Sequence, residues 1–294
     1  MKGTLIELAF KLYRLSGGSF LHFMYKNMKR NSKFGILLYH EISGKTFIKH
    51  ISFLKRRYKI VSLNDLYEIF TNNDFPKNPS LVITFDDGEK SFYHETFPVI
   101  QKMEIPVIIY VITGGIENNG FFEFWWKKTL RLKKLGAKIN KEYLKKVPET
   151  EKEAYLNKLA NIYAYKENIS DIMTNEQIKE ISESDYVTIG SHSVTHPCLS
   201  QTSLERSEFE IFNSKKQLQK LLGQDIEHFA YPDGDYNKDL ENIVIKSGYK
   251  TAALVENQWI NPPENIGLFR LPRVSSGPRD CSVNWLRYRL NKGN

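Results

Sequence analysis

Short apolar runs recur along the chain and alternate with stretches of helical spacing. The runs cover residues 35–39, 81–85, 107–112, 187–189, 229–231 and 251–255. Several are continuous rather than alternating, as expected of parallel strands that are covered on both faces. Stretches with helical spacing, such as residues 63–70 and 204–222, lie between them. The pattern predicts an α/β fold, either a barrel or a doubly wound sheet, with reactive residues where strands end.

The alternation breaks between about residues 115 and 184. This stretch opens with glycines and the aromatic residues of 121–126, and it continues as a Lys- and Glu-rich segment with helical periodicity. We interpret it as a helical insertion between two strands that caps the site. The predicted organisation is an N-terminal segment (1–33), a main domain (34–280) that contains this insertion, and a C-terminal tail (281–294).

The N-terminal segment is amphipathic and basic. Between residues 4 and 15 the polar positions recur every three or four residues, which leaves one narrow polar stripe on an otherwise apolar helix. Such a helix fits a membrane surface, and a helix packed against the domain explains the pattern equally well. No apolar run reaches the roughly 18–20 residues of a spanning helix, and no export signal is visible. We therefore expect a cytoplasmic protein, with peripheral membrane contact through residues 1–33 as one of the two interpretations.

Composition narrows the choice of partners. The net charge of +8 permits an anionic partner, but the basic residues are scattered and no nucleic-acid motif accompanies them. Nucleic-acid binding is therefore not expected. The two cysteines, Cys198 and Cys281, form neither a disulfide framework nor a C-x-x-C pair. The sequence does not predict an oligomeric state.

Candidate chemistry begins with Asp86 and Asp87, which follow the apolar run 81–85 and precede Gly88. Two adjacent carboxylates at a strand end point in different directions, so one can hold a metal while the other handles protons. An acidic pair before glycine also makes ordinary turns. Taken alone, this motif leaves both interpretations open.

His192 and His196 stand four positions apart in the segment His-Ser-Val-Thr-His-Pro. A single histidine is usually a hydrogen-bonded core residue, but two at this spacing can converge on one ion. One carboxylate and two imidazoles make a three-ligand site that leaves room for water. These ligands suit Zn²⁺ and also tolerate Co²⁺, Ni²⁺ or Fe²⁺. Together with the carboxylate pair, they predict metal-assisted hydrolysis.

The segment Phe-Ala-Tyr-Pro-Asp-Gly ends a later apolar run with Tyr231, Pro232, Asp233 and Gly234. The simplest interpretation is a tight turn. The functional interpretation is that its exposed backbone N–H groups form part of an oxyanion pocket. The adjacent pair Trp125–Trp126 in the insertion could stack on sugar rings, and core packing explains such a pair at least as well.

With these motifs in order, the chain resembles the polysaccharide deacetylases, also known as NodB-homology proteins or carbohydrate esterase family four. Residues 84–88 match the first family motif, 192–197 match the second, and 229–234 resemble the third as one subgroup writes it. The likeness extends from about residue 35 to about residue 274. It implies a distorted (β/α)7 barrel, TIM-like but with seven strands. It also implies Asp86 as the general base, with Asp87, His192 and His196 as the metal ligands.

The chain departs from the usual family pattern in three places. No histidine follows His228, so the late catalytic histidine motif is absent. Circularly permuted relatives that de-N-acetylate poly-N-acetylglucosamine carry this histidine in an early Tyr-His segment, which implies His40 as the general acid here; the alternative is a buried histidine at a strand end. The third motif lacks its arginine, for which Arg273 is a candidate replacement or merely a surface residue. Asp233 stands where relatives often have an aromatic residue.

The resemblance implies a hydrolase that removes N-acetyl groups from hexosamine units, such as N-acetylglucosamine, in a polysaccharide or glycolipid of a bacterial surface. The implied cofactor is a divalent metal, Zn²⁺ first and Co²⁺ or Ni²⁺ next, and the implied partner is an N-acetylated glycan. Two alternatives stay open: an O-acetyl carbohydrate esterase with the same site, and a glycan-binding barrel without catalysis. A phosphotransferase with an aspartyl nucleophile would need Asp-x-Asp and a phosphate-binding loop, and the sequence has neither.

Overall fold

A computed structural model describes residues 33–76, 78–144, 147–166, 169–261 and 267–292. The helix and the membrane contact predicted for residues 1–33 lie outside this part of the chain, apart from residue 33, and stay predictions. Within the described ranges, no helix is long and apolar enough to cross a membrane.

The centre of the fold is an eight-stranded parallel sheet in the order β7-β6-β5-β4-β3-β1-β8, with β2 paired to β3 beside this path. The strands are β1 (Phe34–Tyr39), β2 (Lys59–Ile60), β3 (Ser80–Phe85), β4 (Val107–Val111), β5 (Val187–Ser191), β6 (His228–Ala230), β7 (Thr251–Ala253) and β8 (Val274–Ser275). The six apolar runs in the sequence correspond to β1, β3, β4, β5, β6 and β7.

One segment joins the two edges of this sheet. Leu271 lies beside β7, where its N–H donates to the carbonyl of Ala252 at 2.9 Å and its own carbonyl accepts from the N–H of Leu254 at 2.8 Å. A few residues later, Val274 in β8 pairs with Leu37 in β1. The sheet therefore curls round on itself, and the predicted distorted (β/α)7 barrel is confirmed.

Alternate residues of each strand pack on opposite sides of the sheet, as the two-residue period of a strand requires. Leu81 and Ile83 of β3 join the large buried cluster that includes the apolar faces of the surrounding helices. Val82, between them, joins a second cluster that includes Leu66 of α4. Both faces are covered, which explains why the strands read as continuous apolar runs.

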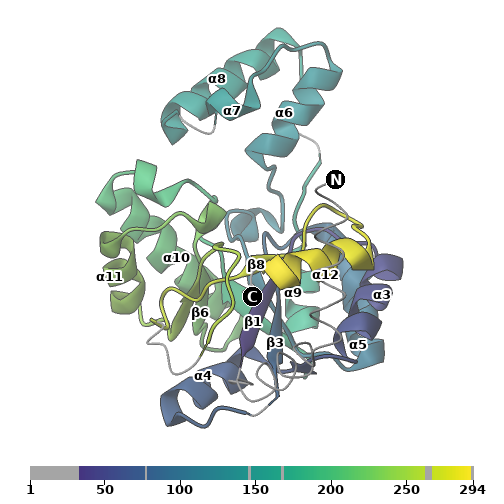
Figure 1. Cartoon of the computed structure of the whole chain (residues 1–294). Coiled ribbons are helices and arrows are strands. Elements are labelled where there is room, and N and C mark those ends of the chain that lie inside the picture. The colour runs from purple at the N-terminus through teal and green to yellow at the C-terminus, as the bar shows by residue number, and fades with distance from the viewer. Residues whose placement is uncertain (1–32, 77, 145–146, 167–168, 262–266, 293–294) are drawn as a thin grey trace, which may run out of the picture.

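Helices surround the sheet (Figure 1). They are α3 (Gly44–Leu54), α4 (Leu63–Asn72), α5 (Phe97–Met103), α9 (Asn175–Ser182), α10 (Leu204–Leu222), α11 (Lys238–Lys246) and α12 (Val283–Lys292), with a short π-helix η1 (Phe92–Thr96) and the short 3-10 helices η2 (Ile116–Asn118), η3 (Leu199–Gln201) and η4 (Pro232–Gly234). Capping residues mark several starts: Ser62 and Thr174 form capping boxes, and Asn237 accepts the N–H of Leu240. These caps fix where the helices begin after the loops.

The insertion forms three helices, α6 (Trp125–Lys134), α7 (Lys141–Leu144) and α8 (Glu149–Ile162), which we call the helical cap (residues 125–162). In Figure 1 the cap lies above the barrel. It has a small core of its own, made of Leu132, Ala137, Ile139, Leu144, Val147, Leu156 and Ala160. Helix α9, which falls inside the predicted insertion, instead packs against β5 and α10 as part of the barrel.

Candidate active site

The candidate residues meet at the carboxyl ends of the strands, where parallel barrels place their reactive groups. His40 follows β1, Asp86 and Asp87 follow β3, His192 follows β5, and Asp233 follows β6. Residues that are far apart in the sequence are therefore adjacent in the fold.

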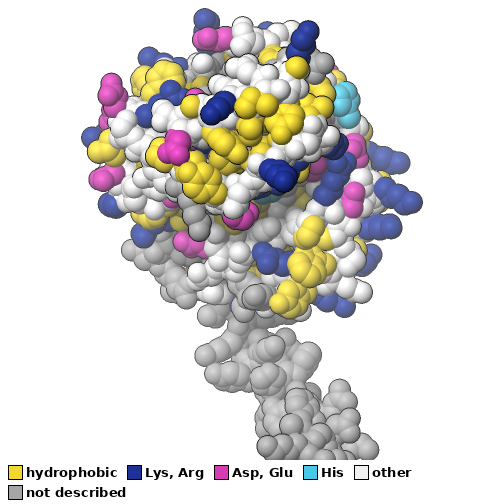
Figure 2. Space-filling view, turned by 90° about the horizontal axis from the view of Figure 1, so that it is seen from above, with side chains coloured by type: hydrophobic (Ala, Val, Ile, Leu, Met, Phe, Trp, Pro, Cys, Tyr) yellow, Lys and Arg dark blue, Asp and Glu magenta, His cyan; other side chains and the backbone are white. Residues whose placement is uncertain are grey.

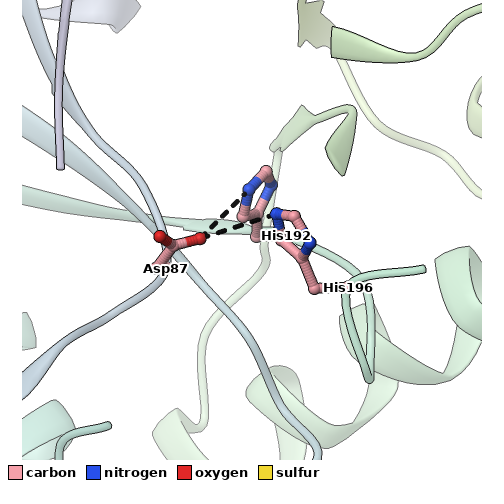
Figure 3. Close-up of side chains that lie close together, drawn as sticks. All are labelled: Asp87, His192 and His196. Atoms are coloured by element: carbon pink, nitrogen blue, oxygen red, sulfur yellow. Dashed lines mark ion pairs between the residues drawn. The ribbon is translucent and has the colours of Figure 1, made fainter. Parts of the chain in front are cut away.

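Asp87, His192 and His196 present their ligand atoms to one another. The Asp87 Oδ1 atom lies 3.7 Å from His192 Nε2 and 3.6 Å from His196 Nε2, and Figure 3 shows both rings turned toward this carboxylate. All three ligand atoms lie within 4.8 Å of one another, and all three residues are buried. A carboxylate oxygen and two imidazole nitrogens in this arrangement fit one divalent ion with a further position open.

His192 is held as a neutral ligand. Its Nδ1 atom lies 2.8 Å from the Ala230 carbonyl oxygen, a contact that requires a proton on Nδ1 and leaves the lone pair on Nε2 toward Asp87. Burial lowers the pKa of His192 to about 4, against the opposing effect of Asp86. The imidazole is therefore neutral at neutral pH, and its Nε2 lone pair is available to a metal.

His196 is positioned differently. Its backbone φ is 59°, a left-handed conformation that non-glycine residues adopt at a cost and that concentrates at functional sites. Its N–H donates to Ser193 Oγ at 3.0 Å. Its buried Nδ1 atom has no hydrogen-bond partner within the described ranges. The edge-to-face contact with Trp126 at 5.1 Å, and the stacking of Trp126 on Phe124, confine the ring instead.

Glu210 of α10 holds the loop between the two histidines in place through hydrogen bonds. Its carboxylate, which is fully buried, accepts the N–H groups of Val194 and Thr195, each at 2.8 Å, and the Thr195 hydroxyl at 2.7 Å. Arg206 forms an ion pair with it at 2.7 Å. Nothing in the sequence distinguishes Glu210 from the other acidic residues of a long charged helix, so its role is visible only in the structure.

Asp86 lies behind the ligands and is paired with Arg273. The guanidinium donates to both carboxylate oxygens, at 2.6 and 2.8 Å, and its Nε donates to the Leu254 carbonyl. Arg273 is completely buried, with Tyr110 against its guanidinium, which rules out a plain surface arginine. Burial alone would raise the pKa of Asp86, but Arg273 outweighs it and lowers this pKa to about 2.

A cavity of about 420 Å³ opens beside these groups. Four of the predicted site residues line this cavity: His40, Asp87, His196 and Asp233. His40 is exposed rather than buried. From the cap, the lining includes Trp125, Trp126, Lys127, Leu130 and Lys141. Barrel and cap therefore share the cavity.

The other residues of the Phe-Ala-Tyr-Pro-Asp-Gly segment do not line this cavity. Tyr231 and Pro232 are buried, and the Tyr231 hydroxyl donates to the Phe269 carbonyl. Gly234 has a φ of 70°, and a Cβ added there would lie 2.8 Å from the Val255 nitrogen. The turn thus brings Asp233 alone, at a φ of 56°, to the cavity.

The cavity lining also includes a cluster of charged side chains that the sequence does not predict. Lys127 of α6 lies between Glu41 and Glu89, with its Nζ 2.8 and 2.5 Å from their oxygens, and Arg279 pairs with Glu41 at 3.1 Å. Burial, together with the neighbouring Glu41 carboxylate, raises the pKa of Glu89. The two contacts of Lys127 join the cap to the barrel at the edge of the site.

Sequence comparisons identify relatives of known class. A model of the family described as polysaccharide deacetylase matches residues 74–252. The putative polysaccharide deacetylase YxkH of Bacillus subtilis is 22% identical over 259 residues, which are 85% of this chain and 74% of that protein. The poly-β-1,6-N-acetyl-D-glucosamine N-deacetylase of Staphylococcus aureus is 23% identical over 236 residues, which are 80% of this chain and 67% of that protein.

A solved structure has the same fold. The Streptococcus pyogenes deacetylase PplD, in complex with acetate, superposes with a TM-score of 0.64 at 21% identity, over 88% of this chain and 99% of that one.

The ion pair of Asp86 gives a prediction for stability against pH. The folded pKa of Asp86 lies below its unfolded value of about 3.9, so the pair stabilises the fold above that value and the effect is lost as pH falls toward about 2. Arg273→Met should lower the free energy of unfolding at pH 7 by roughly 3–5 kcal/mol. In urea titrations from pH 7 to pH 3, the difference in free energy of unfolding between the unsubstituted protein and Arg273→Met should become smaller below about pH 4.

Arg270→Met is the matched control for this experiment, because Arg270 is half exposed and pairs with Glu241 at 3.4 Å. Its effect should stay below about 1 kcal/mol. A gap for Arg273→Met that stays constant down to pH 3 would contradict the assignment of the ion pair.

The loop held by Glu210 gives a second prediction. Glu210→Ala leaves two loop N–H groups without their acceptor, so it should destabilise the protein by roughly 2–4 kcal/mol. The exposed neighbour Glu208 is the control, and Glu208→Ala should stay within about 0.5 kcal/mol of the unsubstituted protein. Equal urea midpoints for the two variants would show that the loop does not depend on Glu210.

Proposed function

The chain belongs to the polysaccharide deacetylase family, and from that premise we propose that it removes acetyl groups from the nitrogen of hexosamine units in a glycan. The observation that carries the proposal is the convergence of Asp87, His192 and His196 beside a cavity that His40 also lines. The Staphylococcus aureus relative, named for action on an N-acetylglucosamine polymer, supports an amide as the bond that is cleaved.

The buried ligands fit a divalent ion, for which we propose Zn²⁺, with Co²⁺ or Ni²⁺ as substitutes. Asp87 supplies negative charge, while His192 and His196 supply neutral nitrogens. When bound, such an ion lowers the pKa of water and polarises a carbonyl oxygen.

Asp86 is proposed as the base that accepts the proton of the attacking water. Arg273 holds its pKa at about 2, so the carboxylate is fully ionised at neutral pH. Its lone pairs that are not engaged by Arg273 remain for this step.

His40 is proposed as the acid that protonates the departing amine. Its place on the exposed rim of the cavity gives it access to a glycan. An amide nitrogen leaves only when it is protonated, whereas an ester oxygen leaves without that help. A backbone N–H of the turn at Asp233 is proposed to donate to the oxyanion that forms. The products are acetate and a free amino sugar.

Substitution of the base should separate turnover from metal binding. Asp86→Asn should lower kcat for an N-acetylated oligosaccharide by about 10²–10⁴-fold while the metal content stays unchanged, because Asp86 is not among the three ligands. His196→Ala should lose both. Acetate release and bound metal are measured on the same samples, with Asp225→Asn as a surface control. Turnover close to that of the unsubstituted protein in Asp86→Asn would reject the base.

Removal of the proposed acid should discriminate between amide and ester. His40→Ala should slow acetate release from an acetamido sugar by about 10²-fold or more and from the matching acetoxy sugar far less. His94→Ala, at an exposed histidine of the barrel, should leave both rates unchanged. If the acetoxy sugar is the better substrate of the unsubstituted protein, the O-acetyl esterase becomes the function. Amide hydrolysis that is normal in His40→Ala removes His40 from the mechanism.

A further inference from the structure

The positive charge of the chain is concentrated in the helical cap. Residues 125–162 contain eleven Lys and Arg residues against four Glu residues, a net charge of +7, whereas the whole chain carries +8. The rest of the protein is therefore almost neutral. The excess of basic over acidic residues therefore lies in one contiguous segment of the sequence, which folds as a small unit.

Within the cap, the charge is polarised. Three of the four glutamates lie in the first turns of α8, at Glu149, Glu151 and Glu153. The lysines of the other end come from the last turn of α6, the loop after it and the last turns of α8. Tyr163 directly follows α8, and Gly136 lies in the loop after α6. The Tyr163 hydroxyl donates to the Gly136 carbonyl at 3.3 Å, so the end of α8 lies against this loop.

We call this end the cap tip and define it by Lys133, Lys134, Leu135, Lys138, Lys158 and Ile162. All six side chains are exposed. Leu135 is 51% exposed and Ile162 is 64% exposed, the highest exposure among the large apolar side chains that the structure describes. None of the four lysines of the tip forms an ion pair with a carboxylate of the residues that the structure describes.

We propose that the cap tip docks on an anionic lipid surface. Lysines near such a surface are attracted by its negative potential, and exposed aliphatic side chains among them enter the boundary between headgroups and acyl chains. Figure 2 views the molecule from above, the side on which Figure 1 places the cap, and shows patches of apolar side chains with Lys and Arg side chains between them. A soluble polyanion would use the lysines but would gain nothing from Leu135 and Ile162.

Docking at the tip keeps the cavity near the lipid. Helix α6 begins at Trp125, which lines the cavity, and ends beside the tip. Its ten residues span about 15 Å. A glycan that projects from the membrane surface is therefore within reach of the cavity. This inference concerns where the protein works, and it goes beyond the proposed reaction.

Vesicle sedimentation of the full chain tests the proposal. Vesicles of phosphatidylcholine alone are compared with vesicles that contain about one third phosphatidylglycerol. The charge variant is Lys133→Gln with Lys134→Gln and Lys138→Gln, and the apolar variant is Leu135→Ser with Ile162→Ser. The matched control on α11 is Ile245→Ser with Lys246→Gln, an exposed Ile-Lys pair of the barrel.

The unsubstituted protein should bind the anionic vesicles, bind the neutral ones much less, and lose binding as salt rises. The charge variant and the apolar variant should each bind anionic vesicles at least about tenfold more weakly, and the control should bind as the unsubstituted protein does. Because the measurement follows the protein and not acetate release, its result is independent of the proposed function.

Three results would overturn the proposal. The first is equal binding to neutral and anionic vesicles. The second is unchanged binding in both tip variants, which would assign any membrane contact to residues 1–33 alone. The third is loss of binding in the charge variant only, together with equal competition by soluble dextran sulfate, which would make the tip a polyanion site.

Discussion

The site depends on the closure of the parallel sheet by a single segment. Residues 268–275 hydrogen-bond to β7 at one end and pair with β1 at the other. Arg273 lies within this segment, so the same connection that joins the sheet edges delivers the guanidinium to Asp86. A fully buried arginine is tolerated because its charge is matched by the carboxylate and its Nε by a backbone carbonyl. The closure of the sheet and the charge balance of the candidate site therefore depend on the same connection.

The barrel and the helical cap each contribute one side of the candidate site. The barrel supplies the three proposed metal ligands and positions them through the Ala230 carbonyl, which contacts His192, and the Glu210 carboxylate, which binds the loop between the two histidines. The cap supplies the wall in front, through the Trp126 ring against His196 and the Lys127 ammonium between two carboxylates. Without the cap, the buried ring of His196 would lose its contact with Trp126, so the insertion forms part of the candidate site.

Much of the fold and of the site was predictable because the relevant patterns are local. Six apolar runs predicted six strands, and the strand-end position of Asp86 and Asp87 predicted their convergence with His192. The two-residue strands β2 and β8 carry too few residues to produce a pattern. Glu210 and Lys127 act through contacts between elements that are distant in sequence, and no local spacing encodes such contacts. The helical character of the insertion was predicted, but α9 proved to belong to the barrel because its apolar face packs on β5.

The central claim is that Asp87, His192 and His196 hold one divalent ion. Anomalous diffraction at the zinc edge, from crystals grown with Zn²⁺, tests it most directly. The account predicts one strong peak about 2.0–2.2 Å from an Asp87 carboxylate oxygen and from the Nε2 atoms of both histidines. A map with no peak between these three side chains, or with zinc held only elsewhere on the protein, would contradict it.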